Sequence, residues 1–497
     1  MTAQQTELSV IVTESSPHGG YRVDSCRLLT LFCVAICCLV TCGAYETNAA
    51  PFANSNYVVM ITLDGMRPEF YLPSDLSAGT QTLSNLMQQG SYAKSAYPPY
   101  PSFTYPGHTT MVTGDFPARH GITANEVFDP LATEPRWFWY ASDIQVPTIW
   151  DAAHNAGLTV GAVSWPVSAG SKSIDWEFPE FPTTPSGFKQ FREYTSPGLL
   201  AEIEAVAGSI TNAGQLATGK WDNLIAATAI DIIRQHKPNL LLVHFIESDH
   251  AQHIGGRSNP NLPEILHKLD GHVHDIIEAT KKAGIYDRTT FIVLGDHGFA
   301  DIHRAVAPNV LLAQNGLITL EDKKVTDWKA FTHHTGGSAA VYVKDPKDTA
   351  TLEKVHALLQ EHAVDPSTSN RLYQIIEKDE LVKLGGPRNA AFYLEGELGV
   401  MFSGAATGGF FRPATLQGNH GYLPTKPGLQ TGFIAAGRGI KKGVVLDSTR
   451  LVDVAPTVAR LLGLDLKNTD GHVIQEILEE STLKARTGEK ISSTATK

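Results

Sequence analysis

The chain has 497 residues, of which 42% are hydrophobic and 18% are charged. This composition is typical of a soluble globular protein with one large or two modest domains, and it excludes a wholly disordered chain. The formal net charge of −11 argues against duplex nucleic acid as a resting partner, because duplex binding needs a basic face. A small anionic substrate is still compatible with this charge if bound cations attract it.

Residues 1–50 differ from the rest of the chain. They hold all five cysteines, which are Cys26, Cys33, Cys37, Cys38 and Cys42. The apolar, uncharged run 28–45 follows two arginines and predicts either a signal peptide or a membrane anchor. We therefore expect an exported protein, whether periplasmic, at the cell surface or membrane-anchored, with its folded body outside the cytoplasm. Contact with a membrane is expected only through this N-terminal segment.

Three apolar runs share one design, in which a β-branched or leucine-rich stretch ends in an aspartate: 57–65 with Asp64, 239–249 with Asp249 and 290–298 with Asp296. Such runs predict buried parallel strands with an acid at the carboxyl end. Segments with helical spacing lie between them, at 146–158, 223–236 and 262–284. This alternation predicts an α/β fold with a doubly wound, mostly parallel sheet flanked by helices. Ligands of such sheets bind beyond the carboxyl ends of the strands.

The domain boundaries follow from changes in composition. Residues 311–400 alternate charged stretches with a short strand and a helix, so we expect a smaller inserted α+β cap there. The α/β pattern on either side predicts one catalytic domain formed by 51–310 and 401–480. The last residues, 481–497, form a polar tail, and we expect its stretch KARTGEKISSTATK, residues 484–497, to be disordered.

Seven oxygen or imidazole donors stand out, and together they are enough for two metal sites: Asp64, Thr104, Asp249, His253, Asp296, His297 and His420. Any one of the acids has a simpler explanation, since an aspartate after a strand commonly caps the next helix. Mixed aspartate and histidine donors without a thiolate favour zinc, with iron, manganese or cobalt as substitutes. Two such ions about 4 Å apart form a clamp for in-line displacement at phosphorus.

Thr104 lies between two prolines in the stretch YPSFTYPGHTT. It is either a turn or cap residue or a nucleophile. The two roles are compatible, because the N-terminus of a helix favours an anion. A nearby dication would favour the alkoxide form of its hydroxyl.

Seven motifs occur in one order along the chain: ITLDGMRP, PSFTYPGHTTMVTGDFPARHGITANEVFDP, PTIWDAAHNAGL, SWPVS, ESDHAQHIGG, GDHG and GNHGY. In this order the chain resembles the nucleotide pyrophosphatase/phosphodiesterases of the alkaline phosphatase superfamily over residues 57–475. The resemblance implies an alkaline phosphatase-like fold. It also implies two Zn²⁺ ions, with other divalent cations as alternatives. One ion would be held by Asp249, His253 and His420, and the other by Asp64, Asp296, His297 and Thr104.

The resemblance also implies roles in the reaction. Thr104 would form a covalent threonyl-phosphate intermediate, which water at the ion of Asp249 then hydrolyses. Asn125 matches the asparagine that donates a hydrogen bond to a non-bridging phosphate oxygen. Tyr105 stands where the family often has phenylalanine, so we expect it to stack on a nucleotide base. Phe178 or Phe181 is either a second wall for that base or an ordinary core aromatic.

We therefore expect a zinc-dependent hydrolase of phosphodiester or pyrophosphate bonds, with a small phosphorylated, nucleotide-type substrate. One alternative is a phosphonoacetate or phosphomonoester hydrolase of the same superfamily, in which a basic group such as Lys172 would grip the second anionic end of the substrate. The other alternative is a non-catalytic extracellular module, which predicts that metal ligands are missing. All seven donors and Asn125 are present in the sequence.

Overall fold

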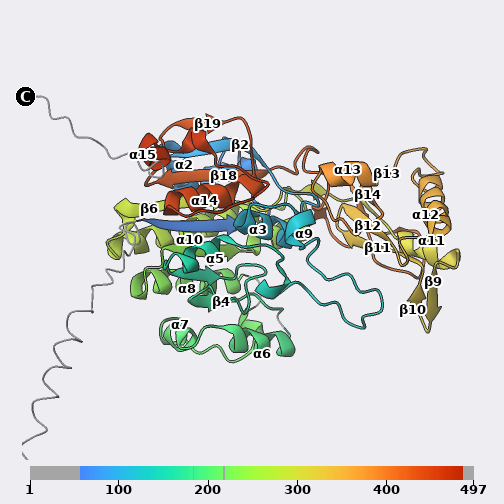
Figure 1. Ribbon diagram of the computed structural model, residues 1–497, viewed down its shortest axis with the longest axis horizontal. Helices are drawn as coiled ribbons and strands as arrows, with labels where there is room; N and C mark the ends of the chain where they lie inside the picture. The colour runs from blue at the N-terminus through green and yellow to red at the C-terminus, as the bar shows by residue number, and fades with distance from the viewer. Residues whose placement is uncertain (1–55, 183, 217–218, 485–497) are drawn as a thin grey trace, which may run out of the picture. The chain divides into compact units, whose positions relative to one another are not determined.

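The computed structural model describes residues 56–182, 184–216 and 219–484 (Figure 1). The expected leader, with its apolar run 28–45, lies outside the described residues. Among the residues that the structure describes, no helix is long and apolar enough to cross a membrane.

A nine-stranded sheet forms the centre of the described chain, in the order β19–β2–β18–β6–β1–β5–β3–β4, with β20 paired to β2. Only β18 runs antiparallel to its neighbours β2 and β6, and the other described pairings of this sheet are parallel. The predicted doubly wound, mostly parallel α/β fold is therefore confirmed. The strands are β1 (Tyr57–Leu63), β2 (Ser91–Tyr97), β3 (Val160–Val163), β4 (Trp176–Phe178), β5 (Leu240–Phe245), β6 (Thr289–Leu294), β18 (Thr431–Gly437), β19 (Val444–Leu446) and β20 (Thr449–Arg450).

The three predicted acid-bearing strands lie side by side. β1 pairs in parallel with β5 on one side and with β6 on the other, and Leu63 lies opposite Phe245. Asp64 directly follows β1, and Asp296 comes two residues after β6. Asp249 lies further on, in the first turn of α9 (Glu247–Gly255). The register therefore brings all three acids to the same edge of the sheet.

Helices cover both faces of this sheet because side chains alternate along each strand. On β1, Val59 and Ile61 pack on one side with the first helix set, which is α2 (Gln81–Gln89), α8 (Trp221–Gln235) and α10 (Leu262–Lys282). Val58 and Met60 pack on the other side with the second helix set, which is α3 (Thr104–Thr113), α5 (Ile149–Asn155) and α14 (Val454–Leu462). The helices predicted at 146–158, 223–236 and 262–284 are α5, α8 and α10.

Several short elements complete this part of the chain. The helices are α4 (Pro117–His120), α6 (Pro185–Tyr194), α7 (Leu199–Ala207) and α15 (Glu480–Lys484). Residues 481–484 of the predicted polar tail belong to α15, and residues 485–497 lie outside the described chain, so the disorder expected beyond α15 stays a prediction. The short strands are β7 (Ala300–Asp301), β8 (Arg304–Val306), β15 (Val400–Phe402), β16 (Phe411–Arg412) and β17 (Gly418–Asn419). β17 pairs with β7, which brings the segment before His420 next to the segment after β6.

A second group of elements gathers past α9, on the right of Figure 1. It has a four-stranded antiparallel sheet in the order β11–β12–β14–β13, a separate hairpin of β9 and β10, and an apolar core of its own. The elements are α11 (Pro308–Gln314), β9 (Ile318–Glu321), β10 (Lys324–Trp328), β11 (Ala330–Thr335), β12 (Ser338–Val343), α12 (Thr349–Glu361), β13 (Tyr373–Ile376), α13 (Lys378–Lys383) and β14 (Phe392–Gly396). The boundaries 311 and 400 of the inserted cap stay a prediction.

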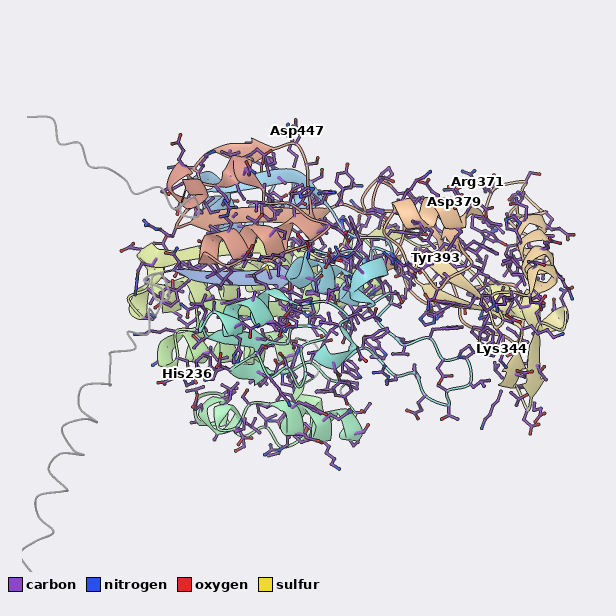
Figure 2. All side chains as sticks on the ribbon, in the orientation of Figure 1. His236, Lys344, Arg371, Asp379, Tyr393 and Asp447 are labelled. Atoms are coloured by element: carbon purple, nitrogen blue, oxygen red, sulfur yellow. The ribbon has the colours of Figure 1, made fainter. Side chains whose placement is uncertain are left out.

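Aromatic contacts link this group to the rest of the chain. Tyr393 on β14 is buried, and its ring centroid lies 5.4 Å from that of Tyr100, which precedes α3 (Figure 2). The charged side chains of Lys344 and Arg371 are more than half exposed. The inserted elements thus pack against the segment that leads into α3 and turn charged groups outward.

Candidate active site

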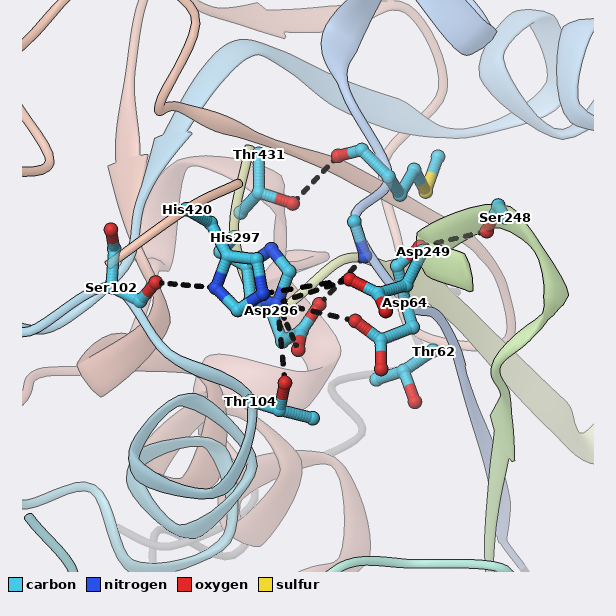
Figure 3. Close-up of polar contacts among 12 residues, drawn as sticks. Thr62, Asp64, Ser102, Thr104, Ser248, Asp249, Asp296, His297, His420 and Thr431 are labelled. Atoms are coloured by element: carbon cyan, nitrogen blue, oxygen red, sulfur yellow. Dashed lines mark hydrogen bonds and ion pairs between the residues drawn. The ribbon is translucent and has the colours of Figure 1, made fainter. Parts of the chain in front are cut away.

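The four predicted donors Asp64, Thr104, Asp296 and His297, here called the deep group, meet around one imidazole nitrogen (Figure 3). His297 Nε2 lies 3.2 Å from Asp64 Oδ1, 3.2 Å from Asp296 Oδ2 and 3.3 Å from Thr104 Oγ1. These atoms come from three places in the chain, namely the ends of β1 and β6 and the first residue of α3. The fold therefore brings the predicted members of this set together.

The remaining three donors, Asp249, His253 and His420, here called the open group, lie beside the deep group. Asp249 Oδ1 lies 3.3 Å from His253 Nε2 and 3.6 Å from His420 Nε2. His297 adjoins both sets, because its ring stacks on that of His420 with centroids 3.4 Å apart and its Nε2 lies 3.9 Å from Asp249 Oδ1. All seven predicted metal donors thus form one cluster.

The two groups differ in burial. The side chains of Asp296 and His297 have no exposed surface, and Thr104 is also buried. In the open group, 18% of the Asp249 side chain and 21% of the His253 side chain are exposed. Solvent therefore reaches the cluster from the side of the open group.

Backbone carbonyls orient the three histidines of the cluster. The Nδ1 atoms of His253, His297 and His420 lie 2.9 to 3.2 Å from the carbonyl oxygens of Gly418, Gly298 and Ser102, respectively. A carbonyl can only accept, so each Nδ1–H donates and each Nε2 turns toward the carboxylates. This arrangement is typical of histidines that bind metals through Nε2.

The carboxylates of the cluster fit a cation. Asp64 Oδ1, Asp249 Oδ1 and Asp296 Oδ2 are buried, and no group in the described chain donates a hydrogen bond to them. Buried carboxylate oxygens without donors are costly unless a positive charge compensates them. The ligand atoms of Asp64, Asp296 and His297 lie within 4.8 Å of one another, and so do those of Asp249, His297 and His420. The residues thus form two adjacent candidate metal sites, and His297 belongs to both.

The pKa values of these groups show where protons compete with a metal. Burial and the neighbouring charge of Asp64 raise the pKa of Asp296 to about 7. Burial alone would lower the pKa of His297, but the carboxylates of Asp296 and Asp64 raise it to about 9. Burial lowers the pKa of His253 to about 4. A cation would therefore displace protons from the deep group, whereas His253 is already neutral near pH 7.

Asn125 lies next to the N-terminus of the helix that carries Thr104. Its Oδ1 accepts a hydrogen bond from the backbone N–H of Tyr105 at 3.0 Å. The N–H donor fixes the orientation of the amide, because only the oxygen can accept, so the Nδ2 donor points the other way. The position suits a donor to a phosphate group bound at Thr104.

The prediction that Tyr105 stacks on a nucleotide base is wrong, because the structure buries this side chain. Tyr105 is 1% exposed, and its ring meets Trp137 and Trp139 edge-on with centroids 5.4 and 5.8 Å away. Phe178 and Phe181 are also buried, so both are core aromatics.

Sequence reasoning missed the two tryptophans that cover Tyr105. Trp137 and Trp139 stack on each other with centroids 5.2 Å apart and an interplanar angle of 8°, and both are partly exposed. Their segment pairs with the segment of Asn125, whose carbonyl accepts from Phe138 N at 2.9 Å. The signal was available in the run RWFWY at 136–140, because alternate residues of an extended segment share one face.

Two further histidines near the cluster were not among the predicted site residues. His108 on α3 and His244 on β5 are fully buried behind the deep group, with ring centroids 4.3 Å apart. His244 interrupts the leucine-rich run of β5, and a polar residue in such a run was the available signal.

Comparisons with known proteins bear on the family of this chain. The model of the family described as type I phosphodiesterase / nucleotide pyrophosphatase matches residues 58–423. An uncharacterised pyrophosphatase/phosphodiesterase of Schizosaccharomyces pombe is 27% identical over 275 residues, which are 55% of this chain and 50% of that protein. Mouse ectonucleotide pyrophosphatase/phosphodiesterase family member 7 is 22% identical over 456 residues, which are 89% of this chain and 90% of that protein. The matched part of the chain thus spans half of the first relative and most of the second.

Solved structures share the fold. Murine ectonucleotide pyrophosphatase/phosphodiesterase 5 superposes with a TM-score of 0.61 at 21% identity, covering 85% of this chain and 100% of that one. An inactive variant of the same murine protein, solved in complex with AMP, superposes with a TM-score of 0.61 at 20% identity over the same shares.

Proposed function

The chain belongs to the type I phosphodiesterase / nucleotide pyrophosphatase family of the alkaline phosphatase superfamily, and from this we propose that it hydrolyses phosphodiester or pyrophosphate bonds in nucleotide-type substrates. The observation that carries the proposal is the position of Thr104. Its hydroxyl lies at the N-terminus of α3, 3.3 Å from His297 Nε2 and among the buried carboxylates of the deep group. A capping role alone would not require six metal donors around it.

The cluster fits two divalent cations, zinc first, one in the deep group and one in the open group. Three carboxylates, three imidazoles and a hydroxyl without any thiolate are the donors that favour zinc among biological dications. When bound, the two ions would neutralise phosphate oxygens and lower the pKa of the threonine hydroxyl and of the attacking water. The number and identity of the ions are part of the proposal.

The reaction then needs two displacements at phosphorus. In the first, the Thr104 hydroxyl releases its proton to solvent, the bond from Oγ1 to phosphorus forms, and the bond to the leaving oxygen breaks. The leaving alcohol or phosphate takes a proton from solvent. In the second, a water molecule releases a proton to solvent as its oxygen attacks the threonyl phosphate, the bond from phosphorus to Oγ1 breaks, and Oγ1 takes up a proton. Two inversions give overall retention of configuration at phosphorus.

Asn125 and the helix stabilise charge during these steps. The Nδ2 group of Asn125 would donate to a non-bridging oxygen, and a preorganised donor of this kind contributes about 3 kcal/mol in other enzymes. The positive end of α3 also favours the anion, by about 0.5 kcal/mol. Both effects act at Thr104, where negative charge develops.

The substrate class is proposed from the partly exposed aromatic pair. Trp137 and Trp139 lie on the segment that pairs with Asn125, so they offer a base the aromatic surface that buried Tyr105 cannot. The AMP complex of the related murine structure supports a nucleotide. Base stacking contributes ~1–3 kcal/mol per base. Replacing Trp137 by Ala should therefore raise KM for a nucleotide diester by about tenfold and leave KM for methyl nitrophenyl phosphate unchanged.

The competing function is hydrolysis of phosphomonoesters or phosphonoacetate at the same cluster. Lys172, the basic group considered for the second anionic end, is exposed in the turn before β4. The non-catalytic alternative predicted missing ligands, whereas the seven donors converge in the structure.

The deciding experiment compares kcat/KM of the zinc-loaded full chain on a nitrophenyl nucleotide diester and on nitrophenyl phosphate. Thr104→Ala is the test variant, and Thr113→Ala is the matched control. Thr113 is buried on the same helix, and its hydroxyl donates to the Thr109 carbonyl and accepts from the backbone N–H of Asp115, so in the described contacts it bonds none of the seven donors. We expect the wild type to prefer the diester. Thr104→Ala should reduce kcat/KM on the diester by about 10⁶-fold, as loss of the covalent nucleophile does in another hydrolase, and Thr113→Ala should leave it nearly unchanged. A monoester preference would support the competing function. Equal background rates in both variants and the wild type would support a non-catalytic module.

A further inference from the structure

His244 lies on β5 directly behind Asp64, with its side chain 1% exposed. Its Nε2 is 3.1 Å from Asp64 Oδ2, and its Nδ1 is 3.0 Å from the carbonyl oxygen of Ser164. Glu180 Oε2 is a second acceptor 3.8 Å from the same Nδ1. The ring is thus placed between Asp64 and the turn that follows β3.

Hydrogen-bond chemistry fixes what His244 does there. A carbonyl and a carboxylate can only accept, so both ring nitrogens must donate. The neighbouring His108 differs, because its Nδ1–H donates to the Thr104 carbonyl at 2.9 Å while its Nε2 faces the Thr62 hydroxyl at 2.9 Å. A hydroxyl can donate, so a neutral ring satisfies His108. Of these two neighbouring histidines, only His244 therefore presents an N–H group on both sides of its ring.

The turn that receives His244 is also held in place. Ser164 adopts a left-handed backbone conformation with φ of 57°, which is uncommon for a residue other than glycine. Its side-chain oxygen accepts a hydrogen bond from Trp221 Nε1 at 2.9 Å. This bond anchors the residue whose carbonyl fixes the tilt of the His244 ring.

We propose that His244 is a positioning residue for the cation of the deep group. By holding Asp64 Oδ2, it leaves Asp64 Oδ1 as the single oxygen of this carboxylate that faces the metal position, where Oδ1 lies 3.2 Å from His297 Nε2. A carboxylate that binds through one oxygen keeps the coordination number low, which suits tetrahedral zinc. Ions that take more oxygen ligands use both oxygens of a carboxylate. His244 therefore selects zinc over larger, oxygen-preferring dications.

This inference rests on the proposed two-cation site, and its test measures metal binding directly, independent of phosphodiester hydrolysis. The zinc affinity of each site and the zinc-over-calcium and zinc-over-manganese preferences are measured by chelator competition on the full chain. His244→Leu removes both donors, and His244→Gln keeps one side-chain N–H donor. The control is His120→Gln, because His120 is equally buried but contacts Thr110 and the Ile122 backbone.

We expect His244→Leu to weaken one of the two zinc sites by about 10- to 100-fold, the range for lost partners of metal ligands, and to narrow the preference for zinc. His244→Gln should fall between the wild type and His244→Leu, and His120→Gln should leave both quantities unchanged. If His244→Leu does not fold, the test is whether His244→Gln prefers zinc over calcium and manganese less strongly than the wild type does. Wild-type affinity and preference in a folded His244 variant would overturn the proposal. Absence of phosphodiesterase activity with two zinc sites intact would instead overturn the proposed function.

Discussion

The deep and open groups share one cluster but differ in their access to water. The deep group holds Thr104 at the start of α3 and has fully buried ligands in Asp296 and His297. The open group exposes about a fifth of His253 and of Asp249. This difference teaches how one cluster can serve two displacements. In the proposed reaction, the threonine nucleophile lies where bulk water is excluded, and the attacking water would enter from the side of the open group.

The largest expected effect comes from removing one ligand from each group. Asp296→Asn keeps the shape of the side chain but removes the charge that a buried cation needs, so we expect loss of one zinc per chain and about a 10³-fold fall in kcat/KM. His253→Asn should also lose one zinc, with about a 10²-fold fall, because the threonine nucleophile keeps its own ion. Zinc content and diester hydrolysis are measured together.

The control for this pair is Asp231→Asn, which alters a buried acid on α8 that belongs to neither group. It should keep both zinc ions and near-normal activity. Equal loss of activity in Asp296→Asn and His253→Asn would remove the functional distinction between the two groups.

The next effect concerns the rates at which a chelator removes the ions. The partly exposed open group should release its ion at least about tenfold faster than the buried deep group, since a buried ligand set must open locally before a chelator reaches it. Zinc release into a coloured chelator should therefore show two phases of equal amplitude. His253→Ala should lack the fast phase. A single phase in the wild type would contradict the difference in access.

The same two groups show what could be predicted from the sequence. Asp64 and Asp296 were placed correctly because each closely follows an apolar strand, and parallel strands in register bring their ends together. Asp249 and His253 could be paired because residues four apart on one helix are neighbours on the same face. The position of His420 depends instead on the pairing of β17 with β7, and motif order along the chain was its only signal.

Tyr105 shows why the rest could not be predicted. Tyr105 is next to Thr104 in the sequence, but the residues that cover its ring are Trp137 and Trp139, which are more than thirty residues away in the chain. Packing of distant segments is not encoded in spacing or local propensity. For the same reason His244 gave no sign that its ring would contact Asp64, because the partnership depends on the parallel pairing of β5 with β1.

The last expected effect is a difference in how pH affects zinc binding. The pKa of His297 is about 9 and that of His253 is about 4 in the metal-free protein. A metal binds only the neutral imidazole, so below pH 9 a proton must leave His297, whereas above pH 4 none needs to leave His253. Zinc affinity should therefore rise as the pH rises toward 9, by up to about tenfold per unit for one displaced proton, and then level off.

Two variants test which group causes this dependence of zinc affinity on pH. His253→Ala should lower the affinity of the open group but keep the slope between pH 7 and 9, because the titrating imidazole is still present. His297→Asn should lower the affinity of the deep group and reduce the slope, because the imidazole whose proton the metal displaces is gone. The slope that remains belongs to Asp296, whose pKa of about 7 rises when the neighbouring imidazolium is removed. The measurement is chelator competition at several pH values at constant ionic strength. The prediction would be contradicted if the pH dependence of zinc affinity disappeared in His253→Ala and persisted in His297→Asn. The proton that zinc displaces would then belong to the open group and not to the deep group.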